Sequence, residues 1–516
     1  MQEYVVTVHD SSAWDTLWTE LTTATKGAIH TPIRAVAVVN DRPFNDFCAH
    51  VLLTDDEAKI LVEDPRVSTV ELKASLQDDV RQRHHVSHTG NFNRSSLSIA
   101  SSMKNWGLIR CVNKSDPFGV ATALASSFQS NLDGTGVDVI IVDSGVEPNH
   151  PEFAINPDGT GGSRVVDYDW STLNVPGVPS GPSIGGYLGD ISGHGSNCAS
   201  IACGSTQGWA PNAAIYSIRI FSGSNITTGT TLGSIDADYA YDLVRAFHLN
   251  KIAKGITRPT VCNSSWGYES TYSGLQFTMW RGNRYDHTVA QVEYGQVNSS
   301  HPYTINYVNT SVENCAAAGV ILVGAAGNYS HKIDIPGGID YDNFYEYRNN
   351  GSGEKVYYHR GASPTNAPST ICVGAVDNEL TDTLKERKAF FSETGPRVDL
   401  YAPGAMIMGA YSSTDGDTAI ISDPRSPEYY LTKISGSSQA SPQVAGCAAC
   451  ILQVHPTFTP AEVKAFLIEH SVENILDQEL ASGTGYDNFY YLQDGPNRYL
   501  YLPLSILTTD VSGSVS

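Results

Sequence analysis

The stretch VDVIIVDSGVEPNHPEF, residues 137–153, decides which class of fold this chain adopts. Its first seven residues form a short run rich in valine and isoleucine, which stops at Asp143 and is followed by a serine and a glycine. Apolar residues that follow one another without alternation are typical of a parallel strand buried on both faces of a sheet. The stretch therefore predicts a buried strand with Asp143 at its carboxyl end.

Four more runs of this kind follow along the chain: AAIYSIRIF, TVCNSSW, GVILVGAAG and STICVGAVD. Segments with helical spacing lie between them, for example residues 234–250 and 310–319. This alternation predicts an α/β domain with a doubly wound, mostly parallel sheet flanked by helices. Binding and catalytic sites in such domains form outside the carboxyl ends of the strands. We therefore expect the chemistry of the protein just after these runs.

The N-terminal part of the chain has a different pattern. Residues 1–75 predict a small α+β unit, and residues 76–104 are polar and rich in serine and asparagine, as in a linker open to proteolysis. We expect the large α/β domain to cover residues 105–490 and a C-terminal tail to cover 491–516. Within the first unit, strands are predicted at residues 4–8, 47–53 and 67–74, and helices at 12–24 and 55–65.

The charge of the chain excludes one class of partner. The sequence of 516 residues has 54 acidic and 32 basic residues, a formal net charge of -22. Nucleic acid would be repelled by such a surface. A solvated acidic surface explains the charge, and cation binding remains open.

Nine cysteines are present, an odd number, with spacings unlike those of zinc sites and no histidine expected beside them. They predict mostly buried free thiols, with one or two disulfides left open.

The sequence leaves the location of the protein undecided. No apolar run is long enough to span a bilayer, so no membrane partner is expected. The start, MQEYVVTVHD, lacks the basic and apolar regions of a Sec signal peptide. An intracellular setting, release by a non-Sec route and association with a virion all remain open.

Four polar residues stand where chemistry is expected. Asp143 ends the first strand, His194 lies between two glycines in ISGHGSNCASIACG, and Asn328 follows the run GVILVGAAG. Ser438 lies in ISGSSQASPQVAG, residues 434–446, just before a helix of small residues, with Pro442 expected in its first turn. Taken singly, each has an ordinary alternative: a metal or ribose ligand, a structural histidine, a turn asparagine, a flexible linker.

Together the four suggest one mechanism. A buried carboxylate can orient a histidine, and the histidine can activate a serine. A side-chain amide and the N–H groups at a helix N-terminus can both donate to a developing oxyanion. The chain order Asp, His, Ser is one of the known arrangements of the Ser-His-Asp mechanism.

On these motifs the sequence resembles the subtilases, the subtilisin-like serine proteases, with some features nearer the proteinase K branch. The resemblance covers about residues 105–490, with insertions around 268–310 and 335–365. It implies a serine endopeptidase that cleaves polypeptides. DDEAKILVEDPRVSTVELKA also looks like the end of the subtilase propeptide, which implies a zymogen with its own prodomain as intramolecular inhibitor. An unrelated α+β domain is the alternative. The further matching segments are GWAPNAAIYSIRIF, VCNSSWG, FSETGPRVDLYAPG and NWGLIRC.

The resemblance also implies a role for each site residue. Ser438 would be the nucleophile, His194 the general base, Asp143 its orienting carboxylate and Asn328 the oxyanion donor. The implied substrate-binding residues are Ser265, Trp266 and Gly267 in the substrate-pairing strand and Ala325, Ala326 and Gly327 around an S1 pocket with an apolar or broad preference. Trp266 would either shape a more distant subsite or lie in the core.

Some residues depart from the family pattern. Asn197 stands where a second histidine is usual, Ser437 and Gln439 replace threonine and methionine, and Gln443 replaces a common histidine. No triad member is lost, so the departures bear on the substrate site and on turnover.

The chemistry needs no cofactor, and no metal site is identified. A structural Ca²⁺ is allowed by the family and the acidic composition but is not placed. The alternative function is a catalytically silent or latent subtilase fold in a larger assembly, such as a viral particle. The aromatic tail would then either dock an assembly partner or simply cap the domain. An esterase is disfavoured because G-x-S-x-G is absent at Ser438.

Overall fold

A computed structural model describes most of the chain. The described residues are 1–23, 30–40, 47–73, 80–84, 103–119, 124, 128, 130, 132–156, 158–178, 188–271, 277–286, 300–349, 352–411, 420–478 and 491–503.

A central sheet of eight strands organises the larger part of the molecule, in the order β23-β24-β19-β18-β15-β10-β6-β7. All neighbours from β24 to β7 are parallel, and only β23 runs antiparallel, at one edge. The five apolar runs of the sequence all form strands of this sheet, so the predicted α/β fold is confirmed. The strands are β6 (Asp138–Asp143), β7 (Ala214–Arg219), β10 (Thr260–Ser264), β15 (Ile321–Ala325), β18 (Ile371–Val376), β19 (Leu400–Pro403), β23 (Val472–Glu473) and β24 (Arg498–Tyr499).

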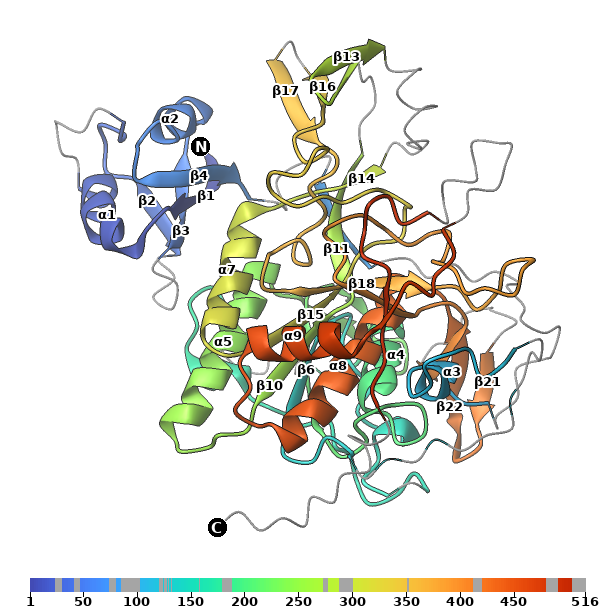
Figure 1. Cartoon of the computed structure of the whole chain (residues 1–516). Helices are drawn as coiled ribbons and strands as arrows, with labels where there is room; N and C mark the ends of the chain where they lie inside the picture. Colours follow the sequence, from blue (N-terminus) through green and yellow to red (C-terminus); the bar gives the residue numbers. More distant parts are fainter. Residues whose placement is uncertain are drawn as a thin grey trace.

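Helices cover both faces of this sheet (Figure 1). Alternate residues of β6 show why, since Val139 and Ile141 join one apolar cluster while Ile140 and Val142 join another. The first cluster includes α4 (His194–Cys203), α8 (Ser437–Val454) and α9 (Pro460–His470), and the second includes α5 (Ala237–Ala253) and α7 (Asn306–Ala317). The short α3 (Trp106–Arg110) precedes the sheet, and single turns lie at η1 (Ser11–Ala13), η3 (Pro151–Phe153) and η4 (Trp170–Leu173).

The N-terminal residues form a separate antiparallel sheet, β2-β3-β1-β4, with its own apolar core. It lies beside α7 and is drawn in blue in Figure 1. Strand β2 is absent from the sequence prediction because three of its four residues are exposed, which leaves no clear alternation. The elements are β1 (Gln2–Val8), α1 (Trp14–Thr22), β2 (Ala37–Asn40), β3 (Cys48–Leu53), α2 (Asp55–Leu61) and β4 (Val67–Leu72).

Smaller sheets occupy the predicted insertions and the linker. Strand β11 lies between β5, from the linker, and β14. A four-stranded sheet, β13-β12-β16-β17, uses residues from both insertions. The remaining small sheets are β20-β22-β21 and β8-β9. Their bounds are β5 (Val80–His84), β8 (Gly223–Ser224), β9 (Thr231–Leu232), β11 (Trp266–Thr271), β12 (Phe277–Trp280), β13 (Asn283–Asp286), β14 (Ser300–Pro302), β16 (Phe344–Asn349), β17 (Ser352–Tyr357), β20 (Ile407–Tyr411), β21 (Ile420–Asp423) and β22 (Ser426–Ile434).

The stretch expected as a C-terminal tail is partly built into the main core. Leu492, Tyr499, Leu500 and Leu502 are buried there, and the remainder of the tail, residues 504–516, lies outside the described part. All nine cysteines are buried and free, as the thiol interpretation predicts.

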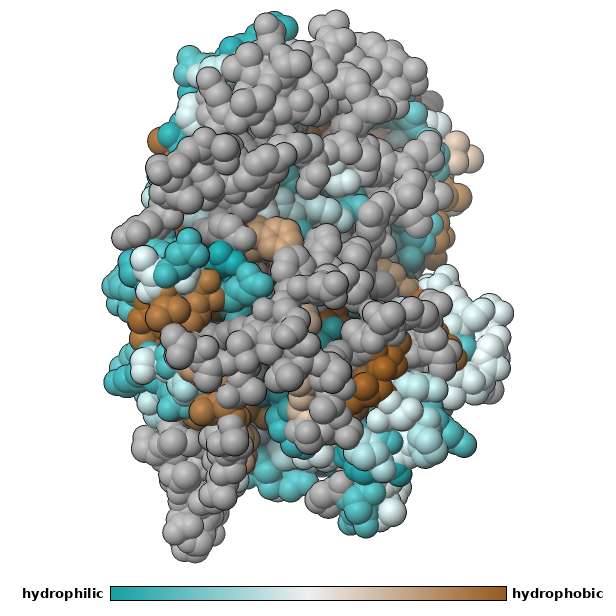
Figure 2. All heavy atoms as spheres, turned by 90° about the vertical axis from the view of Figure 1, so that its right-hand side faces the viewer, coloured by the Kyte–Doolittle hydropathy of each residue, from teal (hydrophilic) through white to brown (hydrophobic). Residues whose placement is uncertain are grey.

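Among the described helices, none is long and apolar enough to cross a membrane. On the face that Figure 2 shows, the coloured hydrophobic residues form separate patches among hydrophilic ones.

Candidate active site

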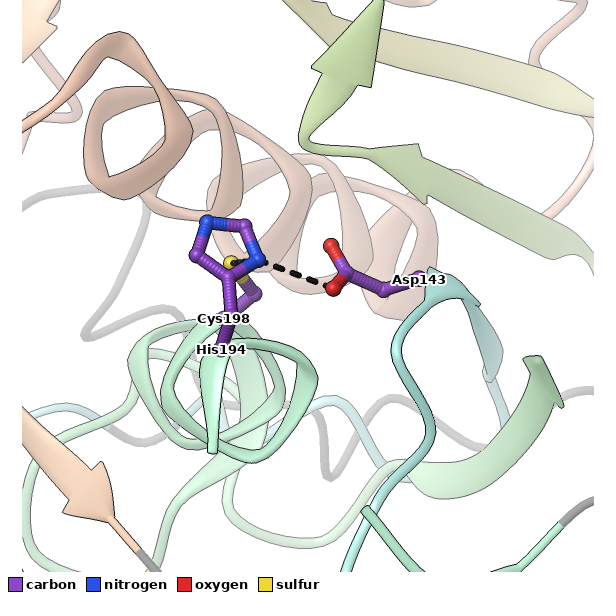
Figure 3. A group of neighbouring side chains, drawn as sticks. All are labelled: Asp143, His194 and Cys198. Atoms are coloured by element: carbon purple, nitrogen blue, oxygen red, sulfur yellow. Dashed lines mark hydrogen bonds and ion pairs between the residues drawn. The ribbon is translucent and has the colours of Figure 1, made fainter. Parts of the chain in front are cut away.

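Asp143 and His194 meet at the carboxyl end of β6. Asp143 is the last residue of that strand, and His194 is the first residue of α4. His194 Nδ1 lies 2.8 Å from Asp143 Oδ1 (Figure 3), and the Ser144 backbone N–H donates to the same oxygen at 2.7 Å. Both residues are buried. Burial lowers the pKa of His194, but the Asp143 carboxylate and the neighbouring Cys198 together raise it by more, so this pKa lies well above 6.5.

The turn before His194 depends on a carboxylate that the sequence analysis missed. Asp190 is fully buried and accepts hydrogen bonds from Ser144 Oγ at 2.7 Å, from the Gly193 N–H at 3.0 Å and from the Ser196 N–H at 2.8 Å. It thereby ties the end of β6 to the N-terminus of α4. An acidic residue just ahead of a Gly-rich helix start was the available signal.

Ser438 lies in the first turn of α8, which begins at Ser437. The prediction that Pro442 sits in the first helical turn is therefore wrong, because Pro442 lies farther inside the helix. Proline has no N–H, so the carbonyl four residues earlier, that of Ser438, receives no helical hydrogen bond from it. Ser265 Oγ donates to this carbonyl at 2.9 Å instead, and Ser438 Oγ donates to the Ser265 carbonyl at 2.9 Å. The two serines thus hold each other through a reciprocal pair of bonds.

Cys198 lies between the histidine and the serine. Its Sγ is 3.9 Å from His194 Nδ1 and donates to the Ser438 carbonyl at 3.4 Å. The expectation that no histidine accompanies the cysteines is therefore wrong at this position. The donor atoms of Asp143, His194 and Cys198 lie within 4.8 Å of one another, a spacing compatible with a metal ion. Burial raises the pKa of the Cys198 thiol above its ordinary value.

Asn328 approaches the same helix start from the end of β15. Its Oδ1 accepts from the Ser437 N–H at 2.8 Å and from Ser437 Oγ at 2.9 Å. This leaves the Nδ2 donor turned toward Gly436. A Cβ placed on Gly436 would lie 3.4 Å from Asn328 Nδ2 and 3.5 Å from the Ser438 nitrogen. These two nitrogen atoms, together with Gln439 Oε1 at 2.8 Å from the same point, surround Gly436 at the start of α8.

Some of the predicted substrate-binding residues contact the start of α8, and others are buried in the core. Ser265 contacts Ser438 directly, and the Gly327 N–H donates to Ser437 Oγ at 3.0 Å. Ala325 and Ala326 are buried at the end of β15. Of the two alternatives for Trp266, the structure shows the core: its ring is fully buried and packs against Tyr241, Tyr268 and Phe221.

The backbone of the predicted substrate strand is already paired. In β11, Trp266 lies opposite His84 and Gly267 opposite Arg83, both in the antiparallel strand β5. The other edge of β11 pairs with β14. Strand β5 comes from the predicted linker and occupies the edge that starts next to Ser265.

Comparison with known proteins gives one consistent result. A model of the Subtilase family (peptidase S8) matches residues 134–487. The chain is similar to alkaline serine exoprotease A of Vibrio alginolyticus, with 24% identity over 84% of this chain and 57% of that protein. It is also similar to the extracellular serine proteinase of Thermus sp. (strain Rt41A), with 25% identity over 83% of this chain and 71% of that protein.

Among solved structures, fervidolysin from Fervidobacterium pennivorans, described as a keratinolytic enzyme related to subtilisin, superposes with a TM-score of 0.53. The match covers 98% of this chain and 60% of that one at 17% identity.

Proposed function

Because the chain belongs to the Subtilase family, a family of serine endopeptidases, we propose that it hydrolyses peptide bonds through Asp143, His194 and Ser438. The observation that carries this proposal is the 2.8 Å contact between His194 Nδ1 and Asp143 Oδ1, beside a serine held at a helix start. Every member of the predicted triad is present, which disfavours the catalytically silent alternative. A nearness to the proteinase K branch and a structural Ca²⁺ site stay predictions.

In the proposed reaction, Ser438 Oγ attacks the carbonyl carbon of the substrate while His194 Nε2 takes its proton. Asp143 fixes the tautomer of His194 and stabilises the imidazolium that forms. The Ser438 N–H and Asn328 Nδ2 stabilise the oxyanion. His194 then gives its proton to the leaving amine, and water completes the hydrolysis by the reverse steps.

The first test combines labelling and N-terminal analysis of the full chain. A fluorophosphonate probe is expected to modify Ser438, with the modified peptide identified by mass spectrometry. No label on chain whose N-terminus has been processed would argue against the proposed nucleophile. No label on a chain with intact Met1 would instead require cleavage of residues 76–104 by an added protease before the test is repeated.

Replacing Asn328 by alanine is expected to lower kcat by about 10²- to 10³-fold while KM changes little, because one oxyanion donor is lost only in the transition state. The measurement is steady-state hydrolysis of a peptide substrate. Asn212→Ala is a matched control, since Asn212 makes a surface hydrogen bond to Asp133 away from the site. An unchanged kcat in Asn328→Ala would remove this residue from the mechanism.

We further propose that residues 1–75 act as a prodomain that inhibits the enzyme in its own chain. The support is the pairing of β5 with the β11 edge beside Ser265. Since this pairing ends at His84, we expect the processing cut at one of the peptide bonds that follow His84, inside the predicted linker. Residues 85–102 lie outside the described part of the chain, so the new N-terminus must come from mass spectrometry. Cleavage before Val80 would contradict this placement.

Charged groups join this unit to the catalytic part. His50 lies between two carboxylates, with Nδ1 2.6 Å from Glu3 and Nε2 2.9 Å from Asp238. Lys73 pairs with Asp236 at 2.7 Å. Glu71 accepts from Asn306 Nδ2 at 3.1 Å and from the Tyr307 N–H at 3.2 Å, at the start of α7. The contact is thus built from groups that titrate.

This contact is expected to weaken as the pH rises from 6 to 8. Burial raises the pKa of Glu71 from 4.5 to about 7, against the hydrogen bonds from α7, which lower it. A raised carboxyl pKa means that ionisation opposes docking, so docking is strongest below pH 4.5 and is weakened as pH rises through about 7.

After cleavage of the linker, the N-terminal unit and the catalytic part form a complex of two chains. We expect the dissociation constant of this complex to rise with pH by up to about 10-fold per pH unit for each titrating group. Size-exclusion chromatography of the processed protein at pH 6 and pH 8 measures it. Glu71→Gln should show a smaller pH dependence, and tighter association at pH 8 than at pH 6 would contradict the prediction.

A further inference from the structure

The loop 327–330, which carries Asn328, has a backbone that other parts of the chain must hold in place. Gly327 has a φ of 127° and Ser330 a φ of 62°, so both ends of the loop lie in the left-handed region. That region is unfavourable for a serine, and glycine loses more conformational freedom on folding than other residues. The position of Asn328 therefore depends on what packs against this loop.

The segment between strands β18 and β19 supplies these contacts. The backbone N–H of Ser330 donates to the Phe391 carbonyl at 2.8 Å, and Ser330 Oγ donates to the Phe390 carbonyl. The backbone N–H of Glu393 donates to the Gly327 carbonyl at 3.0 Å. The segment thus bonds both ends of the loop.

The side chain of Glu393 reaches the same loop. It is fully buried, and its Oε1 accepts from the Tyr329 backbone N–H at 3.4 Å. The backbone N–H of His331 also bonds this carboxyl group. Glu393 therefore bonds the residue before Asn328 through its backbone and two residues after Asn328 through its side chain. The close approach needs Gly327, because a Cβ there would lie 2.4 Å from Glu393 Cγ.

The carboxyl group of Glu393 acts as an acceptor rather than as a charge. Lys388 is also fully buried, but its Nζ donates to the carbonyls of Ala389 at 2.9 Å and Ser392 at 2.7 Å. Burial raises the pKa of Glu393 well above 4.5, although Lys388 and the two backbone N–H groups lower it. A raised pKa favours the neutral acid, which does not oppose negative charge that develops near Asn328.

We propose that Glu393 is a positioning residue, whose side chain holds the loop 327–330 so that the amide of Asn328 faces the reacting carbonyl. This inference rests on the proposed role of Asn328 as an oxyanion donor. A donor that is already held in place stabilises the transition state without first being ordered, so a looser loop should lower kcat more than it changes KM. Because Glu393 acts through Asn328, its loss cannot cost more than the loss of Asn328 itself.

A double-mutant cycle tests this proposal on the processed protein. Glu393→Leu removes the acceptor at a similar side-chain volume. We expect it to lower kcat for a peptide anilide about 10-fold, the effect of one lost hydrogen bond, with little change in KM. In an Asn328→Ala background the same change should have no further effect, because the donor that it positions is gone. Rates are divided by the concentration of active enzyme, titrated with a fluorophosphonate, so misfolded protein is not counted.

Two further variants separate the acceptor from its surroundings. Glu393→Gln keeps an oxygen acceptor in the same place, so its kcat should equal that of the wild type. Thr394→Val is the matched control, since Thr394 is equally buried next to Glu393. Its Oγ1 bonds the Tyr401 hydroxyl at 3.1 Å and the Tyr491 carbonyl at 3.3 Å rather than the loop. Its kcat should also be unchanged.

Equal falls of kcat on Glu393→Leu with and without Asn328 would overturn the inference, because a residue needed only for folding acts alike in both backgrounds. An unchanged kcat in Glu393→Leu, or a fall in Glu393→Gln as large as that in Glu393→Leu, would overturn it as well. If Glu393→Leu does not fold, Glu393→Ala serves in the same cycle. Failure of the wild type to hydrolyse the anilide would instead overturn the proposed function.

Discussion

Replacing Ser438 by alanine is expected to lower kcat for peptide hydrolysis by about 10⁶-fold and to abolish labelling by fluorophosphonates. The reason is that no other hydroxyl is placed both at the start of α8 and against the Ser265 carbonyl within the described residues. Without Oγ, His194 and Asp143 have no nucleophile to activate. Self-processing of the linker should fail as well, so the variant should keep its N-terminal residues.

Ser441→Ala provides the control for this experiment. Ser441 lies one turn further along α8, is equally buried, and donates to Asn263 Oδ1 at 2.7 Å. Its variant should still be labelled and processed. A Ser438→Ala protein that retains the label, or that processes its own linker after purification, would show that another group is the nucleophile.

Replacing Asp143 by asparagine is expected to lower kcat by about 10⁴-fold at neutral pH. The carboxylate both accepts from His194 Nδ1 and raises the pKa of that ring. An amide in its place preserves the shape but can hold the ring in the wrong tautomer and does not stabilise the imidazolium.

The pH profile separates this electrostatic role from a loss of folding. His194 must be neutral to act as base, so kcat/KM rises with pH through its pKa, which lies well above 6.5. In Asp143→Asn the carboxylate is gone, so the residual activity should reach its plateau at a lower pH.

Asp138→Asn, at the other end of β6, is the control, because Asp138 pairs with Lys251 at 2.5 Å and does not contact His194. Asp138→Asn should change the stability of the protein but leave the rise of kcat/KM at the same pH as in the wild type. If kcat/KM rises at the same pH in Asp143→Asn as in the wild type, Asp143 does not set the pKa of His194.

The sequence alone predicted the central sheet and the position of Asp143 at the end of one of its strands. The reason is that a parallel strand buried on both faces, such as β6, must be apolar throughout, and that signal survives without knowledge of its neighbours. Asp143 and Ser438 stand out because polar residues directly after such strands or before small-residue helices need an explanation.

What escaped prediction depends on contacts distant in sequence. The place of Pro442 inside α8 follows from the bonds that Ser265 makes to Ser438, 173 residues away along the chain. The link between Asn197 and Gln439 joins two helices, and each residue alone looks like an ordinary substitution. Strand β5 was assigned to a linker because its polar composition carries no strand period, and its partner β11 supplies the order.

In the proposed inhibition, β5 competes with a substrate strand for β11, and because β5 is tethered to the same chain this competition does not depend on protein concentration. A short tether holds a binding segment at an effective concentration in the millimolar range, well above that of most peptide substrates. Once the linker is cut, the same strand pairing becomes an encounter between two molecules. The fraction of β11 that is paired with β5 then falls on dilution. Cleavage would therefore turn a block that is independent of concentration into one that weakens as the protein is diluted. An enzyme released from a confined space into a larger one would thus gain activity without any further chemical change.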